Sequence, residues 1–145
     1  MEGCIFCGIA RGVEKSYTIY RGRSIVAFLD KYPVSKGHTL VIPEDHYESV
    51  HDTPPQVAAK VWVAASAIAS YFRNELGAPA VNVLTNSGKY AGQVIFHFHV
   101  HVIPRWEPMK SFWGGRRVLT DPEASEVLDM LKGVEKKIEE YLGAL

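Results

Sequence analysis

Three histidines separated by single apolar residues form the most distinctive chemical feature of the sequence: His97, His99 and His101. Side chains alternate between the two faces of a β-strand, so a strand here would place all three imidazoles on one face. The residues between and beside them would fill the opposite face and pack against the core: Phe96, Phe98, Val100 and Val102. An imidazole can bind a metal, move a proton or attack phosphorus. The pattern therefore predicts a chemical site on one side of a strand.

Two chemical interpretations of this strand remain open. His-x-His on a strand is a common zinc geometry, so the histidines could hold a metal ion. Alternatively, one imidazole could be a nucleophile towards phosphorus while its neighbours bind the phosphoryl oxygens. The preceding loop, residues 86–93, favours the second interpretation because it contains two glycines and ends on Gln93. Its amide side chains and backbone N–H groups suit phosphate oxygens without adding charge.

Apolar periodicity and turn residues predict the elements that position the histidines. Strands are expected at residues 16–20, 24–30, 38–42, 80–85 and 95–104. A long helix is expected at 54–76 and an amphipathic C-terminal helix at 122–142. Strands grouped around one long helix favour an α+β fold with an antiparallel five-stranded sheet. The long helix is apolar almost all round, so it needs two partners: the sheet and, as a candidate, a second subunit.

The composition describes an ordinary globular chain of one domain, residues 1–145, with 47% apolar and 22% charged residues. Sixteen Lys and Arg balance sixteen Asp and Glu, so the formal net charge is zero. Nucleic acid and anionic membranes both attract a basic excess, so neither is expected as a partner. No apolar stretch is long enough to span a bilayer, and the first residues do not resemble a secretory signal. A cytoplasmic protein is therefore expected.

The histidine strand, taken with the Gly-Gln before it, resembles the signature of the histidine triad (HIT) superfamily. Further matching segments are residues 28–30 (Phe-Leu-Asp), 37–43 (Gly-His-Thr-Leu-Val-Ile-Pro) and Asn86. The resemblance covers about residues 4–105 and leaves the tail, 106–145, less diagnostic. It implies a nucleotide-binding α+β homodimer whose sheet extends across two subunits, and which hydrolyses or transfers nucleoside monophosphates.

The resemblance also implies roles for individual residues. His99 would be the nucleophile that attacks the α-phosphorus and forms a nucleotidyl-histidine, which water then hydrolyses. His101, Gln93 and the backbone N–H of Val94 would donate to the phosphoryl oxygens. The remaining contacts would be Asn86 with phosphate and ribose, Asp30 with the ribose hydroxyls, Ile5, Phe6, Ile9 and Phe28 around the base, and His38 behind the triad. Many relatives carry Ser or Thr where this chain has Val94, so a hydroxyl is missing here.

A second site is implied at the N-terminus, where Cys4 and Cys7 form a Cys-x-x-Cys pair. A zinc-bearing subset of the superfamily combines this pair with a histidine after the Val-Ile-Pro strand and with the first histidine of the triad. Those residues are His46 and His97 here. Two cysteines and two histidines can close the tetrahedron of a structural zinc site. Zinc is thus the expected cofactor, and no organic cofactor is expected.

The leading functional hypothesis is a hydrolase or transferase that acts through His99 on a purine nucleotide of the AMP type. Its substrate would be a nucleoside phosphoramidate, as in the Hint-like branch, or a dinucleoside polyphosphate, as in the Fhit-like branch. Residues 104–106 (Pro-Arg-Trp) lean towards the second. One alternative is a sensor or scaffold that binds AMP with little turnover. Another is a zinc-dependent hydrolase in which the histidine cluster holds a catalytic metal.

Overall fold

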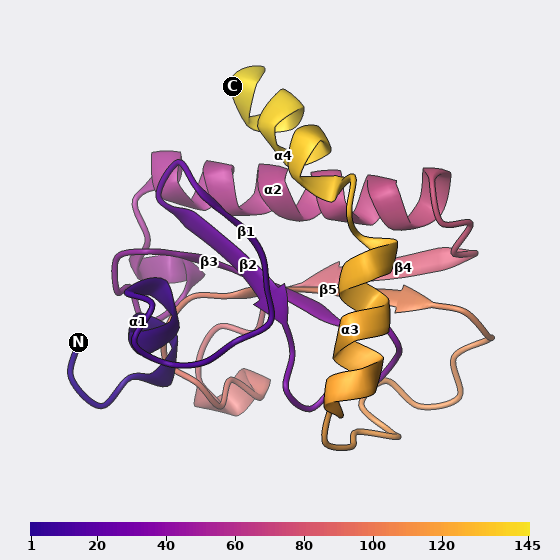
Figure 1. Ribbon diagram of the computed structural model, residues 1–145. Helices are drawn as coiled ribbons and strands as arrows, with labels where there is room; N and C mark the ends of the chain where they lie inside the picture. Colours follow the sequence, from indigo (N-terminus) through magenta and orange to yellow (C-terminus); the bar gives the residue numbers. More distant parts are fainter.

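The computed structural model describes all 145 residues, and its strands form a single sheet between helices (Figure 1). The elements in chain order are α1 (Ile5–Ala10), β1 (Thr18–Gly22), β2 (Ile25–Leu29), β3 (Thr39–Pro43), α2 (Pro55–Asn74), β4 (Ala80–Leu84), β5 (Val100–Arg105), α3 (Asp121–Met130) and α4 (Val134–Gly143). Two short 3₁₀ helices lie in loops: Val50–Asp52 between β3 and α2, and Lys89–Ala91 between β4 and β5. None of the helices combines the length and apolar composition that a membrane span requires.

The sheet has the strand order β1-β2-β3-β5-β4, and every neighbouring pair is antiparallel. This confirms the predicted α+β fold with a five-stranded antiparallel sheet. The register pairs Leu40 of β3 with His101 of β5, in the middle of the sheet. His101 therefore shares a face with Leu40, and Val100 shares the opposite face with its partner Val41.

The predicted strand at 95–104 is wrong in its first half, because regular pairing begins only at Val100. His97 and His99 precede the strand, in a segment held by other contacts. Phe98 N–H donates to Tyr47 O at 2.6 Å, and Thr85 Oγ1 donates to His99 O at 2.7 Å. Phe98 is fully buried as expected, whereas Phe96 is 42% exposed and does not belong to the core.

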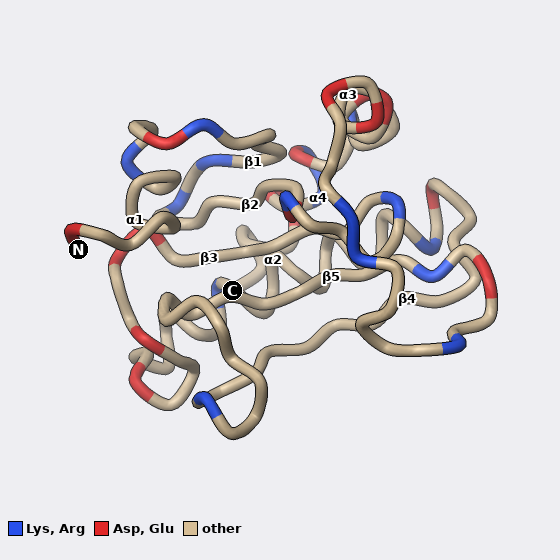
Figure 2. Tube along the Cα trace, turned by 90° about the horizontal axis from the view of Figure 1, so that it is seen from below, with Lys and Arg blue, Asp and Glu red and all other residues tan.

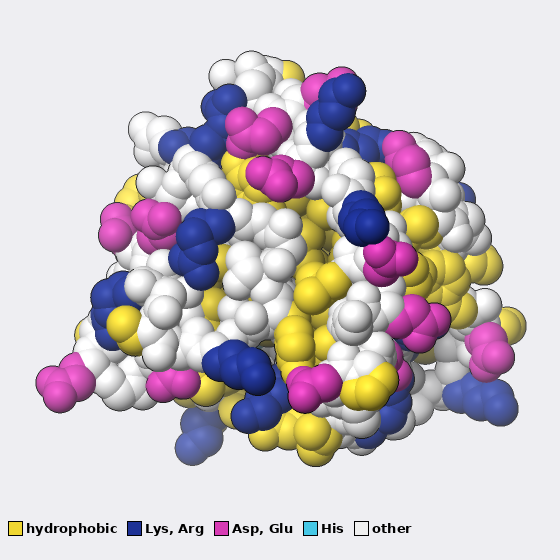
Figure 3. All heavy atoms as spheres, viewed as in Figure 1, with side chains coloured by type: hydrophobic (Ala, Val, Ile, Leu, Met, Phe, Trp, Pro, Cys, Tyr) yellow, Lys and Arg dark blue, Asp and Glu magenta, His cyan; other side chains and the backbone are white.

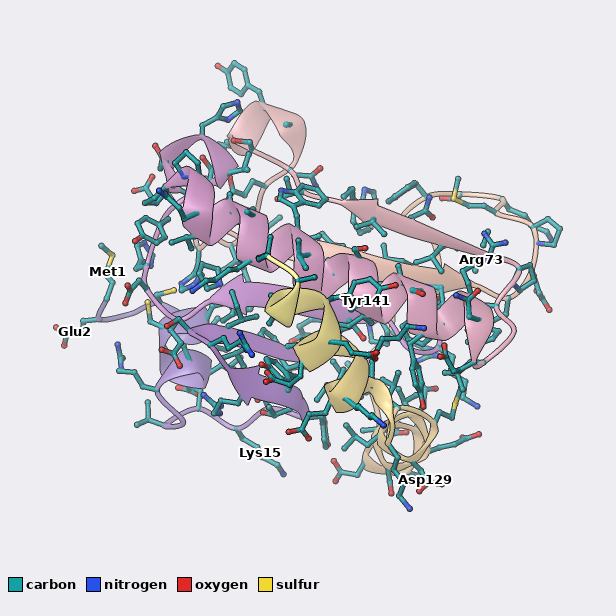
Figure 4. All side chains as sticks on the ribbon, turned by 90° about the horizontal axis from the view of Figure 1, so that it is seen from above. Met1, Glu2, Lys15, Arg73, Asp129 and Tyr141 are labelled. Atoms are coloured by element: carbon teal, nitrogen blue, oxygen red, sulfur yellow. The ribbon has the colours of Figure 1, made fainter.

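The main core lies between one face of the sheet and α2, which runs across it. Figure 4, seen from above, shows α4 crossing α2 on the side away from the sheet. Buried residues of α4, such as Ile138 and Leu142, belong to the same core cluster as Ile68 and Phe72 of α2. The second partner of α2 therefore comes from the same chain. Whether a second subunit also binds stays a prediction.

The single C-terminal helix predicted at 122–142 is instead two helices, α3 and α4, which lie at a wide angle to each other (Figure 1). Gly133 marks the break. Its N–H donates to Tyr71 Oη at 3.2 Å, and a Cβ there would lie 2.9 Å from the same oxygen. The Tyr71 side chain of α2 therefore contacts the backbone at the break between α3 and α4.

A smaller core covers the other face of the sheet, where α1 packs on β2 and β3. Its members are Phe6, Ile9, Ala10, Val26, Phe28, Leu40 and Ile42. Gly37 precedes β3 with a φ of +99°, and a Cβ there would lie 2.9 Å from the ring of Phe72. Glycine thus allows the turn that places His38 directly before β3. Figure 3 shows positive and negative side chains interspersed over the face in view, as the balanced composition suggests.

Candidate active site

The proton on His99 is positioned by the backbone of the same segment. His99 Nδ1 lies 2.7 Å from His97 O, and a carbonyl oxygen can only accept, so Nδ1 carries the proton. The other nitrogen, Nε2, then holds an unprotonated lone pair. Burial lowers the pKa of His99, which keeps the imidazole neutral at pH 7. A neutral ring with a free Nε2 lone pair is the form in which histidine acts as a nucleophile.

A second hydrogen-bond chain sets the proton positions of His38 and His101. Val34 N–H donates to His38 Nδ1 at 3.1 Å, so the proton of His38 is on Nε2. His38 Nε2 lies 2.9 Å from His101 Nδ1 and donates to it. His101 Nε2 must then carry a proton, which makes it a hydrogen-bond donor. The rings of His99 and His101 are 5.0 Å apart, so an acceptor of this proton would lie beside the nucleophile.

Asp30 follows β2 and is buried beside the same histidines. Its Oδ1 accepts the N–H of Tyr32 at 2.8 Å. Its Oδ2 lies 3.2 Å from Arg116 Nη2 and 3.4 Å from His38 Nε2. The carboxylate is therefore next to His38, where its oxygens are available to hydroxyl donors only in competition with Arg116.

The buried histidines predict an acid-sensitive stability: burial lowers the pKa of His97 to about 4, and His38 and His101 are affected more strongly. Burial lowers the pKa of His38 and of His101 to about 3 each, with the charge of Arg116 contributing in both. An unfolded histidine takes up a proton near pH 6.5, so between pH 6.5 and about 3 the unfolded state binds more protons. The free energy of unfolding should be constant above pH 6.5 and fall below it, by up to about 1.4 kcal/mol per pH unit for each histidine.

Urea unfolding at pH 7.5 and pH 5.5, in the presence of a chelator so that metal release adds nothing, measures this slope. His38→Asn should reduce the slope without abolishing it, because His97 and His101 remain. His51→Asn, a change at an exposed histidine, should leave the slope unchanged. Equal stability of the unmodified chain at the two pH values would contradict the buried neutral pair.

The loop before the histidines is organised by Gln93, which is 5% exposed. Its Oε1 accepts Gly88 N–H at 2.8 Å, and its Nε2 donates to Glu48 O at 2.6 Å and to Ile95 O at 3.0 Å. All of these partners are backbone atoms, so in this structure Gln93 shapes the loop. The N–H of Val94 donates to no protein atom, and it stays available to a ligand.

Three of the four residues predicted to surround a base lie together in the smaller core. Phe6 meets Phe28 edge to face at 5.3 Å between ring centroids, and Ile9 belongs to the same cluster. Phe6 also meets His99 edge to face at 5.2 Å. Ile5 lies outside the cluster and is 47% exposed. Asn86 is half-buried in the loop that approaches the histidines. The role of each of these residues in ligand binding stays a prediction.

The predicted metal ligands converge at one end of the same face. The possible ligand atoms of Cys4, Cys7, His46 and His97 all lie within 4.8 Å of one another. His97 Nδ1 is 3.6 Å from Cys4 Sγ and 3.5 Å from Cys7 Sγ, and His46 Nδ1 is 3.3 Å from Cys7 Sγ. Zn–S bonds of about 2.3 Å and Zn–N bonds of about 2.0–2.1 Å at tetrahedral angles place S and N about 3.5 Å apart. The cluster thus fits a tetrahedral zinc ion.

The proton positions in the cluster agree with metal binding. His97 Nε2 donates to Pro43 O at 2.9 Å, which leaves the lone pair of Nδ1 pointing towards the two sulfurs. Burial raises the pKa of the Cys4 thiol in the metal-free cluster. A bound dication would lower that pKa, because it stabilises the thiolate. His97 is therefore turned away from His99 and His101, so the three histidines serve two different clusters.

Two side chains at this site were not expected from the sequence: Trp113 and Arg116. The Trp113 ring lies 5.1 Å from His101, and Arg116 pairs with Asp30. Both belong to the tail, which matched no motif. The sequence signal that could have indicated them is the segment 113–117, a tryptophan followed by two glycines and two arginines.

Comparison with known protein families finds that the HIT domain matches residues 11–107. An uncharacterised HIT-like protein of Saccharolobus solfataricus is 43% identical over 103 residues, which cover 71% of this chain and 74% of that protein. The adenylylsulfatase HINT3 of Arabidopsis thaliana is 35% identical over 134 residues, which cover 89% of this chain and 68% of that protein.

Solved structures show the same fold. A zinc-bound histidine triad family protein from Mycobacterium smegmatis superimposes with a TM-score of 0.79 at 33% identity, covering 99% of this chain and 98% of that one. A hypothetical histidine triad nucleotide-binding protein from Sulfolobus tokodaii gives a TM-score of 0.76 at 35% identity, covering 94% and 93%. The arrangement of strands and helices described above is thus that of histidine triad proteins.

Proposed function

This chain belongs to the HIT domain family, and from that premise we propose that it cleaves a nucleoside monophosphate from a phosphoramidate or a dinucleoside polyphosphate. The reaction would proceed through a covalent nucleotidyl-histidine at His99. The observation that carries the proposal is the 2.7 Å contact between His99 Nδ1 and His97 O, which leaves Nε2 free to attack. The adenylylsulfatase activity in the name of the Arabidopsis relative supports a reaction at an adenylyl phosphorus.

The residues can carry out both steps. In the first step the lone pair of His99 Nε2 forms a bond to the α-phosphorus. The bond from the α-phosphorus to the leaving group breaks, and its electron pair stays with the leaving group. From a dinucleoside polyphosphate the leaving group is a nucleoside polyphosphate. From a phosphoramidate it is an amine, which takes a proton from water. The His101 Nε2–H and the Val94 N–H would donate to the phosphoryl oxygens, where negative charge develops. In the second step water attacks phosphorus, the N–P electron pair returns to Nε2, and the proton of water passes to solvent.

Trapping the intermediate tests this proposal. Incubation with an adenylate donor labelled in the α-phosphate, followed by rapid quenching, should leave acid-labile label on His99. The label should be absent from His99→Asn. Turnover that a chelator abolishes, with no adduct at any time, would contradict covalent catalysis and support the metal alternative described below. Tight AMP binding with neither turnover nor label would support a sensor.

We also propose that Cys4, Cys7, His46 and His97 hold a structural zinc ion. The contacts within the cluster support it, as does the zinc-bound relative from Mycobacterium smegmatis. The ion would supply a cross-link between the start of α1, the segment after β3 and the histidine segment. Phe6, between the two cysteines, contacts both His97 and His99, so this cross-link would hold the nucleophile in place. Two free cysteines suit a reducing compartment such as the cytoplasm.

Specific observations favour each alternative function. Val94 is 84% exposed and has no hydroxyl to assist a leaving group, which favours a nucleotide sensor or scaffold. Asp30, His38 and His101 form a second buried group whose ligand atoms lie within 4.8 Å of one another, and a catalytic metal would bind there. However, the 2.9 Å contact between His38 and His101 contains a proton, since Nδ1 of His38 already accepts Val34 N–H. The hydrogen-bonded arrangement therefore favours the metal-free nucleophile.

A further inference from the structure

Residues 112–119, here called the strap, lie against the proposed active site and are held by a backbone hydrogen bond near each end. Arg105 Nη2 donates to Phe112 O at 2.9 Å, and the N–H of Leu119 donates to Lys31 O at 2.9 Å. Lys31 directly follows Asp30, so the hydrogen bond from Leu119 holds the strap beside the Asp30 carboxylate. Figure 2 shows a stretch of positive residues in the segment that leads into α3. The strap is thus a built part of the site.

Two side chains of the strap reach the site. Trp113 lies with its ring centroid 5.1 Å from that of His101 and 6.5 Å from that of His38. The guanidinium of Arg116 lies over the Trp113 ring at 5.4 Å, and Nη2 is 3.2 Å from Asp30 Oδ2. Gly115, with a φ of +82°, allows the chain to reverse so that Trp113 and Arg116 stack. Stacking on an aromatic face leaves the guanidinium edges free for oxygen acceptors.

The charge of Arg116 is the element that the proposed phosphate contacts lack. The His101 ring and the Val94 N–H are both neutral donors, whereas a nucleotide carries negative charge on each phosphate. The positive charge of Arg116 acts on His38 and His101, since it helps to lower the pKa of both. The same field attracts a phosphate bound at His101.

The partner of Arg116 can be exchanged when a nucleotide binds. If the ribose hydroxyls bind Asp30, as the family resemblance implies, they compete with Arg116 for Oδ2. The Arg116 side chain is 37% exposed, so it has room to move. A guanidinium released from Asp30 would find phosphate oxygens beside His101, and Arg–phosphate pairs are among the stronger hydrogen-bonded contacts.

We propose that Arg116 is a substrate-binding residue that contacts the phosphate chain of the nucleotide, with Trp113 as the platform that orients it. Only a dinucleoside polyphosphate has phosphates beyond the one that His99 would attack, so a contact with the phosphate chain would favour that class over phosphoramidates. This inference rests on the proposed nucleotide function and narrows it to a substrate class.

Binding measurements test the inference without turnover. In a His99→Asn background, which should not consume the ligand, calorimetry would compare adenosine, AMP and diadenosine tetraphosphate. Arg116→Gln should weaken diadenosine tetraphosphate binding by about ten- to hundredfold, because a charge-assisted hydrogen bond is lost. AMP should lose less, and adenosine should change less than about twofold. Arg116→Lys should recover part of the loss, because it keeps the charge.

Arg117→Gln is the matched control, since this neighbouring arginine pairs with Glu123 of α3 and not with the site. It should leave all three affinities unchanged. Tighter AMP binding in Arg116→Gln would overturn the inference, because it would show that Arg116 competes with the nucleotide for Asp30. Equal effects on all three ligands, or none, would also overturn it and leave Arg116 a scaffold residue. If the parent His99→Asn chain bound none of the three ligands, the proposed function would fail together with the inference.

Discussion

The His99→Asn variant is expected to lose turnover of an adenylate donor by about 10³-fold or more, because it removes the nucleophile. An asparagine amide can still donate to His97 O, so the segment around position 99 should keep its conformation. It offers no nitrogen lone pair to phosphorus. AMP affinity should therefore stay within a few-fold of the original value. Steady-state kinetics and AMP binding by calorimetry check the two halves of the expectation.

His51→Asn is the control for this variant. His51 is exposed in the loop before α2, where it contacts Ser87, and no contact joins it to the histidine clusters. The same chemical change there should leave turnover intact. A His99→Asn enzyme that kept its full rate would exclude His99 as the nucleophile. The reaction would then have to proceed through another group, and the buried set formed by Asp30, His38 and His101 would be the first to test.

The His46→Ala variant is expected to lose its zinc. With one of four ligands gone, the apparent affinity should fall by at least about a hundredfold, given that four ligands together contribute about 10–16 kcal/mol. Protein purified without chelator and then dialysed should hold about one zinc per chain before the change and less than about 0.2 after it. The Tm should fall by about 5 °C or more, because zinc binds the folded chain and its binding energy stabilises the fold.

Two features make this experiment decisive. His46 is half-buried, so alanine leaves no large cavity in the core and the chain should still fold. His51→Ala removes an imidazole five residues away that is not near the cysteines, and it should keep both its zinc and its Tm. A chelator should lower the Tm of the original chain and of His51→Ala, but not that of His46→Ala. An unmodified chain with less than about 0.2 zinc in mass spectrometry would contradict the metal site itself.

The strands and the long helix were predictable because periodicity reports burial. Continuous apolar residues in β2 and β3 matched strands that are buried on both faces. All five strands were placed to within a few residues, apart from the first half of the strand predicted at 95–104. Errors arose where the backbone is held by contacts distant in sequence. Tyr47 and Thr85 bind the segment before β5 and interrupt its pairing, and Tyr71 meets Gly133 where one helix was expected.

The candidate residues were also predictable as a set, but their grouping was not. The spacing of His97, His99 and His101 suggested one face of one strand. The structure separates them: His97 lies in the cysteine cluster, His101 pairs with His38, and His99 donates to the backbone. His97 lies before the regular strand, and its Nε2 donates to Pro43 O. Gln93, expected to point at phosphate, has its amide engaged by three backbone atoms, of Gly88, Ile95 and the sequence-distant Glu48.

What the sequence determined by itself is the inventory of chemistry: neutral imidazoles in alternation, a pair of thiols, and one acid after a strand. These are properties of residue types and short spacings. The folded structure alone decided which nitrogen of each histidine carries the proton, through local contacts at His99 and His38 and a distant one at His97, and which charge faces the site. Pro43 O and Arg116 lie far along the chain from His97 and Asp30, and Val34 N–H reaches His38 across an irregular turn. Hydrogen bonds and ion pairs of this kind depend on how the chain folds back on itself, and no local periodicity encodes them.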